Sequence, residues 1–283
     1  MKQLLVVLLV FLFSNSFVAQ DFQGIATYKT KRKLDVKLDS TQMNSEMHER
    51  MIAMLKKQFE KTHILKFNKE ASVYKEDEKL ESPQAVAGGM QMIFVSTDGS
   101  DILYRNTKEN RFTSQNEAFG KIFLIKDTLE KDNWVLGNET KNIGDYTCYK
   151  ATKKRMVEVV ESNISVNGDK DLEADEDEES KMEERTITAW YTPQIPVNSG
   201  PSRYYGLPGL ILEVHDGQET IVCSKIVLNP KNKVTINEPT KGKVITQKKF
   251  EEVVQKRMEE ERERYNPDRD HGDGERIEIR IGG

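Results

Sequence analysis

The chain has 283 residues, of which 36% are hydrophobic and 32% are charged, and its formal net charge is −4 at neutral pH. This length allows one large domain or two small ones, and we expect one. The acidic balance excludes nucleic acid as a partner, because a nucleic-acid-binding surface needs clustered lysine and arginine.

The first residues have the features of a secretory signal peptide. Lys2 precedes an apolar run from Leu4 to Phe13, and polar residues follow before the first acidic residue. A membrane-spanning helix needs about 20 apolar residues, and neither this run nor any other stretch is long enough. We therefore expect residues 1–19 to be removed on export and residues 20–283 to form a single β-rich domain in the periplasm or outside the cell.

A strand and then a helix are predicted first in the mature chain. Apolar and polar residues alternate over Gly24–Thr30, which predicts a strand. Between Met43 and Phe59, apolar side chains recur at spacings of three and four residues and share one face of an amphipathic helix. This face either packs in an ordinary core or lines an adaptable apolar binding surface. Its members are Met43, Met47, Met51, Met54, Leu55 and Phe59.

Short strands separated by turn residues occupy the middle of the chain. His63–Phe67 and Ala71–Tyr74 are expected to form a hairpin, and the spacing of the later strands is typical of an antiparallel meander. Strands do not alternate with helices, so a parallel sheet is not expected. We predict a mainly β (α+β) fold with a curved, half-barrel-like antiparallel meander, an N-terminal amphipathic helix and a C-terminal helix. The later strands are Met92–Val95, Ile102–Asn106, Arg111–Ser114, Lys121–Lys126, Trp134–Leu136 and Gly144–Thr152.

An acidic stretch interrupts the strands at residues 167–185. Ten acidic residues lie between Asp169 and Glu184, so this segment cannot bury apolar area and is predicted to be a flexible, solvated loop. A calcium-binding EF-hand loop needs glycine at its sixth position and glutamate at its twelfth, where this chain has Ala174 and Ser180. We therefore predict no metal site in this loop.

Residues 246–283 are expected to form a charged helix and tail. The helical pattern contains Phe250 and is stopped by the pair Asn266-Pro267. From Ile277 to Ile281 every second residue is isoleucine, which is typical of a strand. Such a strand either pairs with an edge of its own sheet or adds to the sheet of a partner.

Two cysteines, Cys148 and Cys223, lie in predicted strands. In an oxidising compartment they form either an inter-strand disulfide or two buried thiols, and the sequence leaves both alternatives open. Their spacing excludes a Cys-x-x-Cys metal or redox site.

Catalytic motifs are not evident in the chain. The histidines are scattered without metal-ligand spacing, and there is no Gly-x-Ser-x-Gly elbow or phosphate-binding glycine loop. The sequence His215-Asp216-Gly217 is typical of a hairpin turn before it is typical of a proton-transfer pair. We therefore predict no catalytic residue, no metal and no cofactor. The four histidines are His48, His63, His215 and His271.

The most specific motif in the chain is the run from Tyr204 to Leu212, Tyr-Tyr-Gly-Leu-Pro-Gly-Leu-Ile-Leu. Its glycines can take backbone angles that other residues avoid, its proline stiffens the turn, and the apolar residues after it begin a strand. Together these features predict a rigid corner. The residues of this motif are Gly206, Leu207, Pro208, Gly209, Leu210 and Ile211.

Aromatic residues crowd the same part of the sequence. They either line the mouth of a binding site for a sugar, lipid or peptide, or fill the core of a packed corner. The candidate binding residues are Trp190, Tyr191, Tyr204 and Tyr205.

Several sequence blocks, together with this corner, resemble the GLPGLI family of exported bacterial proteins, whose biochemical activity is unassigned. The resemblance implies export and a β-rich fold, and it supplies no reaction. More remotely, the chain is similar to periplasmic lipoprotein-carrier folds, in which a curved antiparallel sheet half-wraps a helix. The blocks are Ile102–Asn106, Phe123–Asp127, Trp134, Glu139–Thr152, Ala189–Pro193, Ile195–Val197 and Gly200-Pro201.

The sequence favours an exported, non-enzymatic protein that binds an apolar ligand or a partner in the cell envelope. Carriage of an apolar ligand requires a persistent cavity between the sheet and the Met43–Phe59 helix. The alternative is an envelope hydrolase acting on glycan or peptide, which requires a close carboxylate pair or a histidine beside a nucleophile in a cleft. A third hypothesis is a purely structural interaction module.

Overall fold

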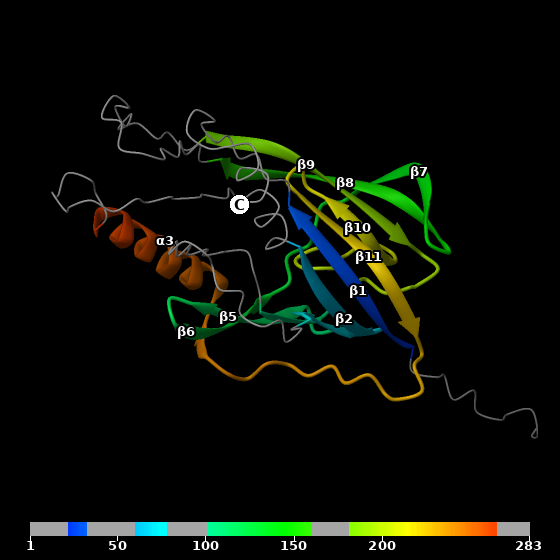
Figure 1. The fold of residues 1–283 in the computed structure, drawn as a ribbon, viewed down its shortest axis with the longest axis horizontal. Coiled ribbons are helices and arrows are strands. Elements are labelled where there is room, and N and C mark those ends of the chain that lie inside the picture. Colours follow the sequence, from blue (N-terminus) through cyan, green and yellow to red (C-terminus); the bar gives the residue numbers. More distant parts are fainter. Residues whose placement is uncertain (1–21, 33–59, 78–100, 160–180, 265–283) are drawn as a thin grey trace, which may run out of the picture.

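The computed structural model describes residues 22–32, 60–77, 101–159 and 181–264 (Figure 1). Twelve strands and one helix lie in these ranges. The predicted signal peptide, N-terminal helix, Met92–Val95 strand and isoleucine tail lie outside them. The elements are β1 (Gln23–Arg32), β2 (Lys61–Asn68), β3 (Ala71–Glu76), β4 (Ile102–Asn106), β5 (Arg111–Ala118), β6 (Lys121–Thr128), β7 (Val135–Ile143), β8 (Tyr146–Val159), β9 (Lys181–Thr192), β10 (Leu210–His215), β11 (Glu219–Leu228), β12 (Lys243–Ile245) and α3 (Gln247–Arg264).

All twelve strands belong to one sheet, in the order β12-β6-β5-β4-β3-β2-β1-β11-β10-β9-β8-β7. Strands β1 to β6 run outward in sequence order on one side, and β7 to β11 run inward on the other side until β11 pairs with β1. The prediction of a mainly β fold built from antiparallel neighbours is confirmed. The prediction that the sheet is antiparallel throughout was wrong, because β12 pairs with β6 in parallel and makes the sheet mixed.

The connection between β6 and β7 shows that this open sheet is strongly curved. Only residues 129–134 join these two strands, and a segment of that length spans at most about 25 Å. Ten strand spacings separate β6 from β7 in the sheet order, which would cover about 48 Å in a flat sheet. The two sides must therefore bend toward each other, although β12 and β7 do not pair and the sheet is not closed.

Several sequence-predicted boundaries differ from the structure, and two of the differences have clear local reasons. The predicted strand from Gly144 to Thr152 begins instead at Tyr146, because Gly144 has a φ of 57° and forms, with Asp145, the tight turn between β7 and β8. The predicted loop 167–185 ends earlier than expected, because β9 begins at Lys181 and pairs with β8 despite its charged sequence.

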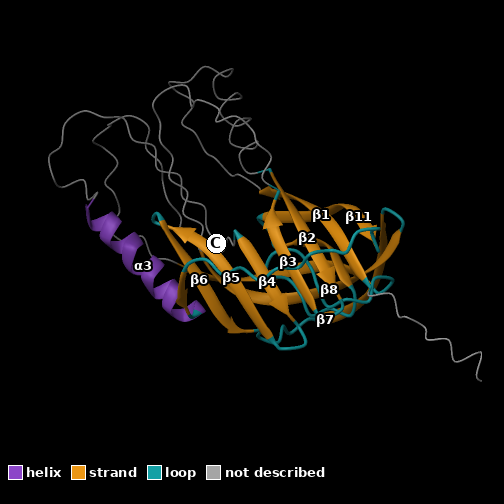
Figure 2. Cartoon of the chain, turned by 90° about the horizontal axis from the view of Figure 1, so that it is seen from below, coloured by secondary structure: helices purple, strands orange, loops and turns teal. Residues whose placement is uncertain are grey.

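One face of the sheet, here called the inner face, carries Arg105, Phe112 and Ile125. Arg105 lies directly opposite Phe112, and Ser114, two residues further along β5, lies opposite Ile125, so these side chains share a face. Helix α3 packs on this face beside β6, where the rings of Phe250 and Phe123 are 5.3 Å apart (Figure 2). Phe112 also contacts the main core, so α3 and that core lie on the same side of the sheet.

The opposite, outer face is crossed by the segment Asn229–Gly242, which leads from β11 to β12. Near its start, the backbone N–H of Val234 donates to the side chain of Gln23 in β1. Further on, a carboxylate oxygen of Glu238 accepts hydrogen bonds from Thr113 (2.6 Å) and Arg111 (2.9 Å) in β5. This segment, here called the strap, thus connects β1 and β5, which are far apart in the sheet order.

Replacing Glu238 with glutamine is expected to destabilise the protein by about 1–2 kcal/mol at neutral pH, because the two hydrogen bonds accepted by its side chain lose the strength that the negative charge gives them. Burial raises the pKa of Glu238, but the hydrogen bonds from Thr113 and Arg111 outweigh burial and hold that pKa below its ordinary value. A depressed pKa gives stabilisation that is complete above the unfolded pKa of about 4.3 and is lost as the pH falls through the folded pKa. Urea unfolding of the wild type and the variant at several pH values measures this difference.

The control for this experiment is Glu184→Gln. Glu184 forms an ion pair with Lys154 in which both side chains are more than half exposed, and such pairs contribute about 0–1 kcal/mol. Equal losses in the two variants, or a Glu238 effect that does not shrink in acid, would contradict the role given to the strap.

Candidate functional site

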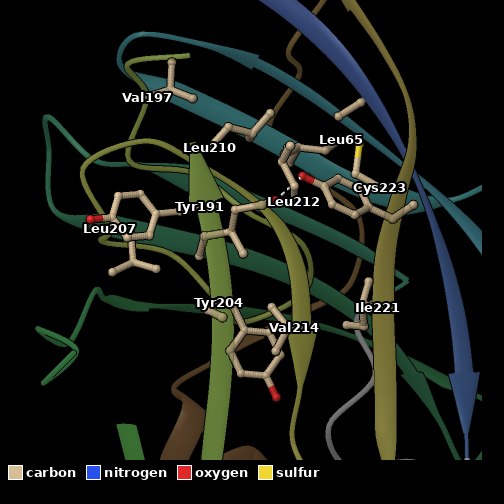
Figure 3. Packing of buried hydrophobic residues seen from close by; sticks show 14 of the residues in the cluster. Leu65, Tyr191, Val197, Tyr204, Leu207, Leu210, Leu212, Val214, Ile221 and Cys223 are labelled. Atoms are coloured by element: carbon tan, nitrogen blue, oxygen red, sulfur yellow. Dashed lines mark hydrogen bonds between the residues drawn. The ribbon is translucent and has the colours of Figure 1, made fainter. Parts of the chain in front are cut away.

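The connection from β9 to β10, residues Pro193–Gly209, packs onto the inner face and is here called the corner loop. Four of its apolar side chains are at most 2% exposed. Figure 3 shows Val197, Tyr204 and Leu207 of the loop among side chains of β9, β10 and β11. The hydroxyl of Tyr28, in β1, reaches across β11 and donates to the carbonyl of Ile211, in β10, at 2.7 Å. The four buried loop residues are Ile195, Val197, Tyr204 and Leu207.

Backbone hydrogen bonds and glycines shape the corner loop. The N–H groups of Leu210 and Ile211 donate back to the carbonyls of Ile195 (3.0 Å) and Ser199 (3.1 Å). Gly206 has a φ of 87° with open space around it, whereas a Cβ on Gly209 would lie 2.2 Å from the carbonyl oxygen of Thr192. Gly206 is therefore needed for a left-handed backbone, and Gly209 for the close approach of two chain segments.

Arg105, in β4, connects the corner loop to the sheet through hydrogen bonds. Its side chain is fully buried, and its Nη2 donates to the carbonyl of Gly200 at 2.6 Å while Nη1 donates to the carbonyl of Tyr204 at 3.4 Å. The guanidinium also lies 5.4 Å from the centre of the Tyr205 ring. Burial lowers the pKa of Arg105 to about 10, so the group stays charged at neutral pH.

The segment that joins β6 to β7 is attached to the other side of the corner loop. The indole N–H of Trp134 donates to the carbonyl of Tyr205 at 2.9 Å, and the hydroxyl of Tyr205 donates to the carbonyl of Glu130. Lys153, in β8, pairs with Asp132 at 2.7 Å and lies over the Trp134 ring at 4.7 Å. The corner loop is therefore held between β4, β8 and the segment that connects the two sides of the sheet.

The structure does not bring the four predicted aromatic binding residues together around one opening. Tyr191 and Tyr204 belong to the buried core, and Tyr205 lies over Arg105. Trp190 points to the opposite face from Tyr191, because successive residues of a strand alternate. There the Nζ of Lys141 lies 4.4 Å from the centre of the Trp190 ring.

Cys148 and Cys223 are both buried free thiols. They belong to β8 and β11, and the two strands β9 and β10 lie between these in the sheet. Burial is the main cause that raises the pKa of Cys148 to about 11 and the pKa of Cys223 to about 12. Both groups are therefore protonated thiols at neutral pH.

We expect neither cysteine of the folded protein to react with a thiol reagent such as DTNB at mildly alkaline pH, because burial blocks access and disfavours the thiolate. After unfolding in concentrated guanidinium, two thiols per chain should react. Cys148→Ala and Cys223→Ala variants should each lose one of the two. A protein that shows no thiol even when unfolded would instead carry a disulfide.

The two described histidines make contacts that neighbouring strands explain. The ring of His63 stacks on Tyr74 with centroids 4.8 Å apart, and burial lowers the pKa of His63 to about 4. The Nδ1 of His215 lies 3.0 Å from the hydroxyl of Thr220, its direct partner in the β10–β11 hairpin. Both contacts follow from strand pairing and require no catalytic role.

Arg105, Lys153 and Asp132 were not singled out by the sequence analysis. A usable signal was present for Arg105, which is two residues from Leu103 in β4 and therefore shares its face with a core residue. No comparable signal marks Asp132, because its contact with Lys153 depends on how the β6–β7 connection crosses the inner face.

The described ranges contain no group of three or more His, Cys, Asp or Glu side chains that could hold a metal ion. Within the same ranges, no helix combines the length and the apolar character needed to cross a membrane.

Comparison with known proteins gives a match to one family model and matches to solved structures. A family model described as a protein of unknown function (Porph_ging) matches residues 134–213, which contain β7, β8, β9 and the corner loop. None of the curated proteins matches the chain. The match is thus to an uncharacterised family, which agrees with the expected type of family and does not supply the GLPGLI name.

The solved structures that match include those of PNGF-II in the C2 and P21 space groups. Each has a TM-score of 0.46, and they share 14% and 16% sequence identity with this chain. In both cases the match covers 83% of this chain and 33% of the PNGF-II chain. The chain thus spans about a third of the length of PNGF-II.

Proposed function

We propose that the chain is an exported, non-enzymatic protein of the GLPGLI type, and that it binds a protein of the cell envelope through the β7–β9 side of its sheet. The position of exposed apolar side chains carries this proposal. Eight large hydrophobic side chains of the described residues are exposed, and five of them lie on β7, β8 and β9. They are Val135, Leu136, Tyr149, Met156 and Met182.

Open strand edges on the same side support a protein as the occupant. In the described part of the chain, β7 is the last strand, so one row of its backbone groups has no strand beside it. β7 reaches only as far as Thr152 along β8, which leaves the edge of Lys153–Val159 uncovered by β7. A partner segment in extended conformation can pair with such an edge while its apolar side chains contact Leu136 and Met156.

The packing of the described interior favours a protein partner over an apolar small ligand. The corner loop fills the inner face beside Arg105 with side chains such as Ile195 and Leu207, which are at most 1% exposed. The cavity required for apolar-ligand carriage was expected beside the Met43–Phe59 helix, which lies outside the described residues. The partner hypothesis needs only the surface that β7–β9 present.

Site-specific photo-crosslinking in the native host tests this proposal. A photoreactive residue at Leu136 or Met156 should give a discrete crosslinked product with an envelope protein. The same residue at Val244, which is 63% exposed at the β12 edge, should not. Leu136→Thr should reduce recovery of the product, and Val244→Thr should leave it unchanged. Equal products from both edges, or none from Leu136, would contradict the proposal.

Fractionation of the host cells tests the prediction of export. Fractionation of the host should recover the protein from the periplasm or the medium, with an N-terminal peptide that begins near Gln20. A full-length chain confined to the cytoplasm would contradict export.

A further inference from the structure

The positive charge of Arg105 is buried, and its described neighbours compensate it only in part. Arg105 is only 2% exposed, and among the described residues no carboxylate forms an ion pair with its guanidinium. Its partners are two carbonyl oxygens and the ring of Tyr205, all uncharged. An uncompensated charge in a protein interior is strongly unfavourable, and interiors therefore pair such charges with an opposite one.

Two hydrogen-bond donors beside the corner loop have no partner among the described residues. The Nε of Arg105 and the hydroxyl of Ser199 are both buried, and neither donates to a group in the described ranges. Ser199 directly precedes Gly200, whose carbonyl accepts from Arg105 at 2.6 Å, so the two donors belong to the same corner of the molecule. Buried donors are nearly always satisfied in native proteins.

The charges around this corner favour an anion as the missing partner. Asp132 is the carboxylate among the described groups that raise the pKa of Arg105, and it already pairs with Lys153 at 2.7 Å. Asp132 is thus held by Lys153, and in the described part of the chain it forms no ion pair with Arg105. The N–H donors of positively charged groups, together with hydroxyl groups, are the usual ligands of small anions.

We infer that Arg105 Nε and the Ser199 hydroxyl form an internal site for a small monovalent anion, either a halide or the carboxylate of a small acid. The site lies under the corner loop and is independent of the proposed partner surface on β7–β9. Occupation of the site neutralises Arg105 and satisfies both donors, so the anion stabilises the loop.

Thermal unfolding at constant ionic strength is the first test. Sodium bromide or sodium formate should raise the melting temperature by about 2–4 °C over sodium gluconate, whose anion is too large to enter, since a ligand that binds only the folded state stabilises it. Bromide alone would indicate a halide site, and formate alone a carboxylate site. Ser199→Ala should abolish most of the shift, whereas Ser224→Ala, at an exposed serine that donates to the carbonyl of Thr27, should retain it.

Bromide anomalous diffraction supplies the second test and does not depend on a variant that folds. An anomalous peak within hydrogen-bond distance of Arg105 Nε and Ser199 Oγ is the expected result. Water or no density at that position, or identical melting temperatures in bromide, formate and gluconate, would overturn the inference.

Discussion

Replacing Gly209 with alanine is expected to destabilise the protein by about 4 kcal/mol or more, the range seen for severe steric faults. A Cβ atom there would lie 2.2 Å from the carbonyl oxygen of Thr192 and 2.8 Å from the backbone nitrogen of Pro193. Both contacts involve backbone atoms, so rotation of a side chain cannot relieve them. The loop would have to move away from the end of β9, and the pairing of Leu210 with Thr192 would be lost with it.

Gly206→Ala is the matched control, because it changes the same motif at a position with open space. Gly206 has a φ of 87°, and nothing lies within 4 Å of the Cβ that alanine would add. Its expected loss of about 1–2 kcal/mol is only the cost of a left-handed backbone. Urea unfolding of both variants measures the difference. Similar losses at Gly206 and Gly209 would show that the close approach to β9 is not the reason for the second glycine.

The sequence was most informative where structure depends on neighbours along the chain. The predicted strand Ile102–Asn106 has the bounds of β4, and the predicted hairpin pairs as β2 with β3. Alternation with period two and turn residues between short strands are local signals, so they can be read without knowing the rest of the molecule. The same local reasoning went wrong at Gly144, where Gly-Asp between two apolar residues is itself a hairpin turn.

Features that depend on distant segments could not be predicted. The parallel pairing of β12 with β6 joins Val244 to Leu124, which lie 120 positions apart in the chain. Nothing in the three residues of β12 specifies that neighbour. Likewise, the corner motif contains no sign that its carbonyls will be bound by an arginine from β4.

The candidate site shows why residue type alone was an uncertain guide. Trp190 and Tyr191 are adjacent in sequence, and a strand sends adjacent side chains to opposite faces. Aromatic residues that are close in the sequence of a strand therefore form a cluster in space only if they lie on the same face of that strand. Charged groups such as Arg105 and Lys153 organise the corner instead, through contacts with Gly200 and Asp132.

Replacing Arg105 with methionine is the second change with a large expected effect, a destabilisation of about 2–4 kcal/mol. The carbonyl oxygens of Gly200 and Tyr204 would lose their donors, and an unsatisfied buried acceptor costs about 1–3 kcal/mol. Removal of an uncompensated buried charge offsets part of this loss. Arg105→Lys should give a smaller loss than Arg105→Met, because an ammonium group can still donate to one carbonyl, although it cannot reproduce the planar fork that reaches both.

Stability alone would not separate loss of the corner loop from general damage, so tryptic cleavage after Arg203 provides a local readout. Arg203 lies within the corner loop and is half-buried in the native protein. If Arg105 holds this loop to β4, Arg105→Met should accelerate cleavage there under native conditions, well before the strands are cut. Lys154→Met, which removes an exposed ion pair from β8, should change stability by at most about 1 kcal/mol and leave the cleavage rate at Arg203 unaltered. Unchanged cleavage in Arg105→Met would mean that the hydrophobic side chains of the loop are sufficient to hold it.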